Sequence, residues 1–452
     1  MQESYLKHVR NTEKNRDLIF AASSYLWKHP ETGYKEWESQ KYLAGEFEKL
    51  GYTLTYAGDI PGFYTDLDTG RPGPTILIMG ELDALCVESH PDADPVTHAV
   101  HACGHSAQGA GILGAAAALK EPGALDDLCG KIRIMAVPAE EAIEIEYREE
   151  LRRKGIIKYF GGKQEFIARG YMDGIDIDIL IHTSSGRQPG MATVDKGANG
   201  FIIKNFTFLG KSAHAAGPSK GINALYAANQ ALSGINALRE TFMEKDHIRV
   251  HPIITAGGTV VNAIPERVTV ESYVRGARVE AILRENEKVN RAAASAALCM
   301  GANLKIADRP GYLPQNYGDD LRKISFRAIQ LALGEDKAAY SDGWGGGSSD
   351  MGDLTVLYPT AYLHVTGATG HGHGNDYRVD DAESLCVNAA KVLTVFVQLL
   401  LENGAERAKQ IIADFEPLYK NKEEYCAAMD AMTLDCTAVT YNEDGTATVR
   451  YK

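Results

Sequence analysis

Short apolar runs, each about the length of one strand, constrain the fold of this chain more than any other feature. Residues 74–80, 131–137 and 176–182 each have the pattern of a buried strand. A helix rich in small residues is expected at 109–120, between the first two runs. Strands that alternate with helices in this way are typical of a mostly parallel sheet with helices packed against it. The sequence therefore predicts an α/β fold.

The pattern changes at about residue 198. Strand alternation at 201–208 and helical periodicity at 223–239 begin a β-α-β-β-α series, which ends with an Ala-rich helix at 282–301. The α/β pattern then returns. We therefore predict an α/β domain with a mostly parallel sheet, formed by 1–197 and by 310–452 with a C-terminal tail, and a smaller inserted α+β domain at 198–309.

The composition argues against several classes of protein. Forty-seven Lys and Arg against 60 Asp and Glu give a net charge of −13, which does not suit a nucleic-acid-binding protein. The longest apolar stretch, 393–401, contains Gln398 and is much shorter than the roughly 20 residues that cross a bilayer, so no membrane partner is expected. The seven cysteines are scattered and odd in number, and the N-terminal segment has no apolar signal core. These features predict a protein of the reducing cytoplasm.

The segment 101–105 (His-Ala-Cys-Gly-His) is the strongest local sign of chemistry. His101, Cys103 and His105 lie within five residues, after one strand-like run and before the small-residue helix. Imidazole and thiolate are the donors that transition metals prefer, and a turn at the end of a strand can direct several of them at one point. The alternative is a turn that happens to contain two histidines and a buried thiol.

A second candidate is the pair Glu140 and Glu141, just beyond the run at 131–137. On an extended backbone, neighbouring side chains point to opposite sides. One carboxylate can then bind a metal while the other faces a water molecule as general base. Adjacent glutamates are also common on solvated surfaces, which is the alternative.

Three further features follow strand-like runs. Asp83 comes shortly after the first run, His182 ends the third, and a glycine-flanked histidine cluster occupies 370–377. A loop cap, a surface histidine and a flexible turn are the respective alternatives. Because the carboxyl ends of parallel strands meet at one edge of a sheet, the combination favours a metal site there.

Taken together, these motifs resemble those of the aminoacylase-type dinuclear metallopeptidase family, and most closely its amidohydrolase branch of hippurate, auxin-conjugate and p-aminobenzoyl-glutamate hydrolases. The resembling segments, in chain order, are 27–31, 81–85, 101–105, 138–141, 182, 210–216, 257–265 and 370–381.

The resemblance implies two divalent metal ions per chain. Their ligands would be Cys103, His105, Glu141, His182 and a C-terminal histidine. The spacing to a following aromatic residue and acidic pair favours His373 for that last place, with His371 as the alternative. Zinc and manganese suit such donors, and cobalt or nickel remain open.

The resemblance also implies the roles of the other residues. Glu140 would be the general base that takes a proton from the metal-bridging water, and Asp83 would orient a ligand histidine. The inserted domain would be a lid that mediates a homodimer. His214, Asn262 and Arg275 of that domain would contact the substrate.

The implied function is metal-dependent hydrolysis of an amide bond in a small N-acyl amino acid or a p-aminobenzoyl-glutamate-like molecule. Two alternatives stay open at this point. One is a dipeptidase or carboxypeptidase acting on small peptides, and the other is a non-catalytic metal- or ligand-binding relative.

Overall fold

The computed structural model describes residues 2–185, 190–341 and 343–452, and the chain forms two compact units. Unit 1 consists of Met1–Gly197, Asn316–Trp344 and Asp353–Lys422, and unit 2 of Ala198–Gln315, Gly345–Gly352 and Glu423–Lys452. The prediction of an α/β protein with an inserted α+β unit is confirmed. The grouping differs from the predicted boundaries in three segments, because residues 310–315, Gly345–Gly352 and Glu423–Lys452 belong to unit 2.

Unit 1 is built on a nine-stranded sheet with the order β1-β2-β6-β3-β7-β17-β8-β16, to which β18 is added beside β17. Its four central strands, β6, β3, β7 and β17, are parallel, whereas β2 and β8 run antiparallel to their central neighbours. The strands are β1 (Thr55–Tyr56), β2 (Phe63–Asp68), β3 (Thr75–Glu81), β6 (Lys131–Val137), β7 (Ile177–Ser185), β8 (Ala192–Val194), β16 (Ala338–Tyr340), β17 (Thr360–Thr369) and β18 (Arg378–Val379).

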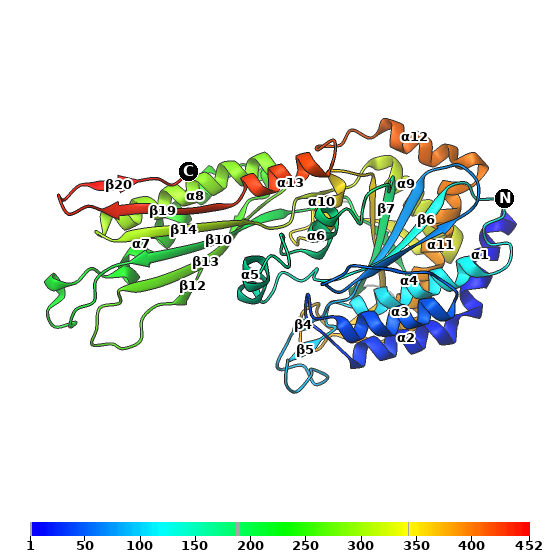
Figure 1. Cartoon of the computed structure of the whole chain (residues 1–452), viewed down its shortest axis with the longest axis horizontal. Coiled ribbons are helices and arrows are strands. Elements are labelled where there is room, and N and C mark those ends of the chain that lie inside the picture. The colour runs from blue at the N-terminus through cyan, green and yellow to red at the C-terminus, as the bar shows by residue number, and fades with distance from the viewer. Residues whose placement is uncertain (1, 186–189, 342) are drawn as a thin grey trace. The chain divides into compact units, whose positions relative to one another are not determined.

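Helices pack against this sheet in layers (Figure 1). They are α1 (Gln2–Lys14), α2 (Arg16–Lys28), α3 (Trp37–Lys49), α4 (His105–Lys120), α5 (Ile145–Arg153), α6 (Gly162–Arg169), α9 (Asp319–Leu333), α11 (Asn388–Leu401) and α12 (Glu406–Asp414). Shorter elements are the strands β4 (Leu85–Cys86) and β5 (Ala99–Val100), the helical turns η4 (Glu335–Lys337), η5 (Glu383–Val387) and η6 (Asn403–Ala405), and α10 (Met351–Thr355) at the boundary of the units.

The small residues of α4 explain how it is buried between β3 and α2. A Cβ on Gly109 would lie 2.7 Å from Leu26 of α2, and one on Gly114 would lie 2.5 Å from Ile19. Real side chains are not accommodated at such distances, so the glycines allow the two helices to approach closely. This packing fixes the first turn of α4, which begins at His105, against the end of β3.

The segment Glu383–Leu401 is a continuous helix of 19 residues, longer than the apolar stretch predicted from the sequence. It has a mean hydropathy of 1.8, which would suit a membrane span, but 94% of it is buried inside the folded chain. α11 packs against α4, α9 and α1. The helix is therefore the core helix of unit 1.

Unit 2 is an antiparallel sheet with the order β11-β13-β10-β14-β19-β20, with β12 beside β13. The helices α7 and α8 pack on each other and on its central strands (Figure 1). Its elements are β10 (Gly200–Leu209), η1 (Pro218–Lys220), α7 (Ala224–Leu238), η2 (Arg239–Thr241), η3 (Glu244–Asp246), β11 (Arg249–Val250), β12 (Ile253–Ala256), β13 (Arg267–Gly276), α8 (Val279–Cys299), β14 (Asn303–Pro310), α13 (Lys422–Ala431), β19 (Leu434–Tyr441) and β20 (Ala447–Val449). The short strands β9 (Gly197–Ala198) and β15 (Gln315–Asn316) lie where the chain passes between the units.

The C-terminal residues explain why the predicted tail belongs to unit 2. Strand β19 pairs with β14 and continues the sheet through β20, as the red and yellow-green ribbons show (Figure 1). Val439 and Ala438 are buried in the core of this unit. Strands β19 and β20 of this segment thus complete the sheet of unit 2.

Candidate metal centre

The predicted chemical residues of unit 1 lie at the carboxyl ends of its four parallel strands. Asp83 follows β3, Glu140 and Glu141 follow β6, His182 lies in the last half of β7, and His373 follows β17. This edge is where open parallel sheets place their ligands. The sheet topology thus brings together residues up to 290 positions apart in the sequence.

Asp83 fixes two groups at once. Nδ1 of His105 lies 3.1 Å from its carboxylate oxygen Oδ1 and 2.8 Å from its carbonyl oxygen, while Oδ2 accepts a hydrogen bond from the backbone N–H of Glu141 at 2.8 Å. With Nδ1 engaged in this way, Nε2 is the nitrogen of His105 that is left for a metal. The position agrees with the predicted orienting role of Asp83.

The turn before α4 requires a glycine. Gly104 has φ 84°, and a Cβ there would collide with Oγ1 of Thr183. That hydroxyl donates to the carbonyl of Cys103 at 3.0 Å and shares a hydrogen bond with the Tyr377 hydroxyl at 2.9 Å. The turn is thus held against β7, and Sγ of Cys103 lies 3.4 Å from Nε2 of His182.

The two glutamates do not lie on an extended backbone, in contrast to the prediction. Strand β6 ends at Val137, and Ala139 adopts φ 57°, a left-handed conformation that is uncommon for a residue with a Cβ. The Ala139 N–H donates to Oε1 of the buried Glu36 at 2.8 Å, which holds this turn. As a result both Glu140 and Glu141 direct a carboxylate oxygen to within 4.8 Å of a ring nitrogen of His105.

Of the two C-terminal histidines, the structure brings His373 to the other donors. Its Nε2 lies 3.3 Å from Oε1 of Glu141, and its backbone N–H donates to the carbonyl of Ala102 at 2.9 Å. The side chain of His371 is 89% exposed and pairs with Asp376 at 2.8 Å. His371 is therefore placed away from the donor cluster.

These side chains form two donor sets that share one thiol. Cys103, His105 and His182 make one set and Cys103, Glu141 and His373 the other, and within each set the donor atoms lie within 4.8 Å of one another. Two further observations show that the residues fit a metal. Nε2 of His105 and Oε1 of Glu141 are buried and form no hydrogen bond within the described part of the chain. Soft sulfur, imidazole and carboxylate together suit divalent transition metals, and these residues would hold them.

Three of the donor side chains hold their protons more tightly than usual when no metal is bound. Burial and the nearby Glu141 carboxylate raise the pKa of the Cys103 thiol well above its ordinary value. Burial alone would lower the pKa of His105, but the carboxylate of Glu81 raises it well above the ordinary value. The Glu141 carboxylate, 3.3 Å from its Nε2, raises the pKa of His373. Metal binding must therefore displace protons.

His101, the first histidine of the sequence motif, lies outside both donor sets. It is buried, and burial lowers its pKa to about 3, so the ring is neutral at neutral pH. Within the motif 101–105, His101 is thus packed in the interior, whereas Cys103 and His105 belong to the donor sets.

The predicted substrate-binding residues lie in unit 2. His214 is exposed and pairs through its backbone with Ala263, and the Ala215 N–H donates to the Asn262 carbonyl at 2.9 Å. His214 and Asn262 therefore lie on neighbouring segments. Arg275 is half-buried, and its guanidinium lies over the rings of Phe201 and Tyr273 and donates to Oγ of Ser348 at 3.2 Å.

Three buried residues behind the donor sets were not predicted from the sequence. Glu36 holds the turn at Ala139, while Glu81 and Lys163 form an ion pair of 2.5 Å with both side chains almost fully buried. Glu81 belongs to the strand whose end was already singled out, so a charged residue inside an apolar run was the available signal. Nothing local marks Lys163, since its partner is 82 residues away.

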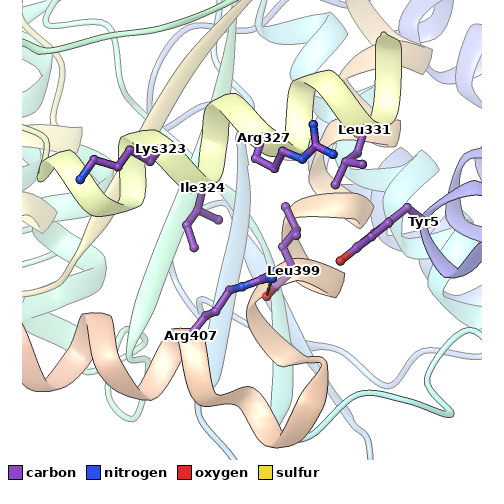
Figure 2. A pocket seen from close by; sticks show the side chains of 7 residues that line it. All are labelled: Tyr5, Lys323, Ile324, Arg327, Leu331, Leu399 and Arg407. Atoms are coloured by element: carbon purple, nitrogen blue, oxygen red, sulfur yellow. Dashed lines mark hydrogen bonds between the residues drawn. The ribbon is translucent and has the colours of Figure 1, made fainter. Parts of the chain in front are cut away.

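Unit 1 also contains a cavity of about 580 Å³ of a different kind (Figure 2). It is lined by Tyr5, Lys323, Ile324, Arg327, Leu331, Leu399 and Arg407. Each of its three cations already has a carboxylate partner: Asp320, Glu335 and Glu402. Leu399 lies near the end of α11, where Leu401 accepts from the Cys129 N–H just before β6 begins. The cavity is therefore at the amino ends of the strands, away from the donor sets.

Fold and site together define a class: α/β proteins with a candidate two-metal centre at the carboxyl edge of a parallel sheet. The sequence profile described as peptidase family M20/M25/M40 matches residues 77–399, which include every residue of the two donor sets. The chain belongs to this family.

Two relatives and one solved structure illustrate the similarity. N-acetyl-L-cysteine deacetylase of Bacillus subtilis is 28% identical over 61% of this chain and 62% of its own length. One of the subunits of p-aminobenzoyl-glutamate hydrolase of Escherichia coli is 29% identical over 66% of this chain and 59% of its own length. The crystal structure of a dinuclear metal-binding peptidase of the M20 family from Bacillus subtilis is 21% identical, covers 86% of this chain and 99% of that one, and has a TM-score of 0.66.

The chain thus spans about three fifths of the length of these two relatives. The resemblance to this family stated from the motifs is confirmed. The solved structure confirms the fold.

Proposed function

We propose that this protein hydrolyses the amide bond of a small N-acyl amino acid or a p-aminobenzoyl-glutamate-like molecule with two bound divalent metal ions. The observation that carries the proposal is the pair of donor sets that share Cys103, with Glu140 beside His105. A mere metal-binding site would not need a second carboxylate beside its ligand glutamate.

The protein residues have distinct roles in this reaction. Two divalent cations, when bound, polarise the scissile carbonyl and lower the pKa of a water molecule. Glu140 accepts the proton of that water and passes it to the leaving amine. Asp83 keeps Nδ1 of His105 engaged and fixes the backbone of Glu141. Glu36 holds the turn that places Glu140.

The metal and the substrate contacts are part of the proposal. We assign zinc or manganese, because the donors combine a thiol with imidazoles and carboxylates. His214, Asn262 and Arg275 are proposed to contact the substrate carbonyl or carboxylate. The names of the two relatives, which concern N-acetylcysteine and p-aminobenzoyl-glutamate, support a substrate with an acyl group and a carboxylate.

We further propose a homodimer formed through residues 198–309. Unit 2 exposes large apolar side chains around a cavity of about 750 Å³, among them Tyr226 (61% exposed), Val260 (57%) and Val261 (100%). An exposed apolar patch of this kind is typical of a protein interface. Val261→Asp should give a monomer in light scattering, and a wild type that is already monomeric would refute the dimer.

A cytoplasmic location is proposed from the cysteines. All seven are free in the structure, including the buried Cys386 and the exposed Cys299. Free thiols, one of them a candidate metal ligand, suit a reducing compartment.

The test combines metal content with turnover. Wild type and Cys103→Ala are analysed by mass spectrometry after reconstitution with zinc or manganese, and assayed on p-aminobenzoyl-glutamate, hippurate and dipeptides. We expect two metals per wild-type chain and release of the amino acid from an acylated substrate, both lost in the variant. Turnover of dipeptides alone would establish a peptidase instead. Two bound metals without any turnover would favour a binding protein.

A further inference from the structure

The buried ion pair of Glu81 and Lys163 lies directly behind the donor sets. Glu81 is the last residue of β3 and Lys163 lies in the first turn of α6, and their side chains are 1% and 0% exposed. Burying two charges is unfavourable, and their attraction offsets only part of that cost.

The second oxygen of Glu81 points to that use. Oε1 takes the Lys163 ammonium, while Oε2 accepts from Nε2 of Gln108 at 2.7 Å and lies 3.2 Å from Nε2 of His105. Gln108 also receives the Glu81 backbone N–H on Oε1 at 3.2 Å. Gln108 thus holds both the backbone and the side chain of Glu81, and Oε2 lies close to the imidazole of His105.

The distance has the size expected of two donors on one ion. Nitrogen and oxygen ligands lie about 2.1 Å from a transition metal, so two of them at angles between square and tetrahedral are about 3.0–3.4 Å apart. The 3.2 Å between Oε2 of Glu81 and Nε2 of His105 falls in this interval. Cys103 and His182, which belong to the same donor set, lie 3.4 Å apart.

The charges agree with this arrangement. The Lys163 ammonium lies 2.5 Å from Oε1, on the opposite oxygen from the one near His105. A carboxylate oxygen retains a lone pair after accepting one hydrogen bond, and that of Oε2 faces His105.

We propose that Glu81 is a sixth metal-binding residue, which places Oε2 on the same ion as His105, and that Lys163 and Gln108 are positioning residues that hold it there. The proposal rests on the proposed two-metal function. It adds a hard oxygen donor to the thiol and two imidazoles of that set, which raises the number of protein donors on this ion from three to four and shifts the preference from zinc toward manganese or cobalt.

The test uses Co²⁺ as the probe, because its visible d–d bands become more intense as its coordination number falls. The double variant Glu81→Gln/Lys163→Met removes both charges of the pair together. We expect more intense Co²⁺ bands, and an affinity about 10- to 100-fold lower for one of the two ions in titration calorimetry. The other ion should bind as in the wild type.

The chain offers a matched control and a gentler variant. Lys204 and Asp308 in unit 2 form a second fully buried pair at 2.6 Å, and Asp308→Asn/Lys204→Met should leave the Co²⁺ spectrum and both affinities unchanged. Glu81→Asp keeps the charge but shortens the side chain by one methylene. It should also lower the affinity for one ion, and it takes the place of the double variant if that variant does not fold.

Unchanged Co²⁺ bands and affinities in the Glu81 variants would overturn the proposal and leave Glu81 as a structural ion pair. That result is distinct from failure of the proposed function, which would appear as fewer than two metals, or as no turnover, in the wild type itself.

Discussion

Two regions of this molecule bury a lysine against a carboxylate, and they differ in what surrounds the pair. In unit 2, Oδ1 of Asp308 accepts from Lys204 at 2.6 Å, and its Oδ2 accepts from Asn286 at 2.9 Å and from Asn290 at 3.3 Å. In unit 1, Oε1 of Glu81 faces Lys163, while its Oε2 lies 3.2 Å from Nε2 of His105, a residue of one donor set. Buried charge alone therefore does not mark a functional site; what distinguishes the pair in unit 1 is that it lies beside candidate metal donors.

The largest effect should come from Glu140→Gln. The substitution keeps the shape of the side chain and removes the base, so kcat should fall by about 10²- to 10⁴-fold. Metal content, measured by mass spectrometry, should stay at the wild-type value because Glu140 is not a member of either set that contains Cys103. A loss of metal together with activity would make Glu140 a ligand and would reverse the assignment of the two glutamates.

Asp308→Asn should separate stability from chemistry. It leaves the buried Lys204 without its counter-ion, and breaking such a pair lowers the free energy of unfolding by about 3–5 kcal/mol. Denaturant titration measures this loss. Metal stoichiometry at a temperature where the variant is folded should be unchanged, and a change would show that the two regions are not independent.

His373→Ala and His371→Ala form a matched pair of variants two residues apart. Removing His373 takes a donor from the second set and should lower the affinity for one metal by at least about 10- to 100-fold in calorimetry. Removing His371 should have no such effect, because its ring is exposed and pairs with Asp376. The opposite ranking would return His371 to the ligand set.

Much of the fold was predictable because its signals are local. The apolar run at 131–137 is β6 with the same bounds, and the runs at 74–80 and 176–182 are β3 and β7 with ends shifted by one to three residues. The change of pattern near residue 198 coincides with the start of unit 2. The residues placed at strand ends meet because parallel strands present their carboxyl ends at one edge.

The rest depends on contacts that no local pattern records. The left-handed turn at Ala139 requires Glu36, 103 residues earlier, as its hydrogen-bond partner. Lys163 lies in an ordinary helical segment, and only the crossover that carries α6 brings it to Glu81. The C-terminal strand β19 finds its partner in β14, about 130 positions away, so the tail could not be assigned to unit 2 from its own sequence.

The smallest predicted effect is the pH dependence of metal affinity. It should distinguish the donor sets from the buried Lys204–Asp308 pair of unit 2. The pKa values of His105, His373 and Cys103 are raised in the metal-free protein, so these groups keep their protons to a higher pH than usual, and a metal must displace those protons. Metal affinity should therefore rise with pH, by about tenfold per pH unit for each proton displaced, and level off once pH exceeds the raised values. The sign for stability is the opposite: a histidine with a raised pKa stabilises the metal-free fold below its ordinary pKa near 6.5, and this contribution is lost as pH rises through the raised value.

Calorimetry in buffers of different ionisation enthalpy counts the protons released on binding. The count should fall by one in His373→Ala and stay at the wild-type value in Asp308→Asn; an unchanged count in the first variant would mean that His373 carries no proton that the metal replaces.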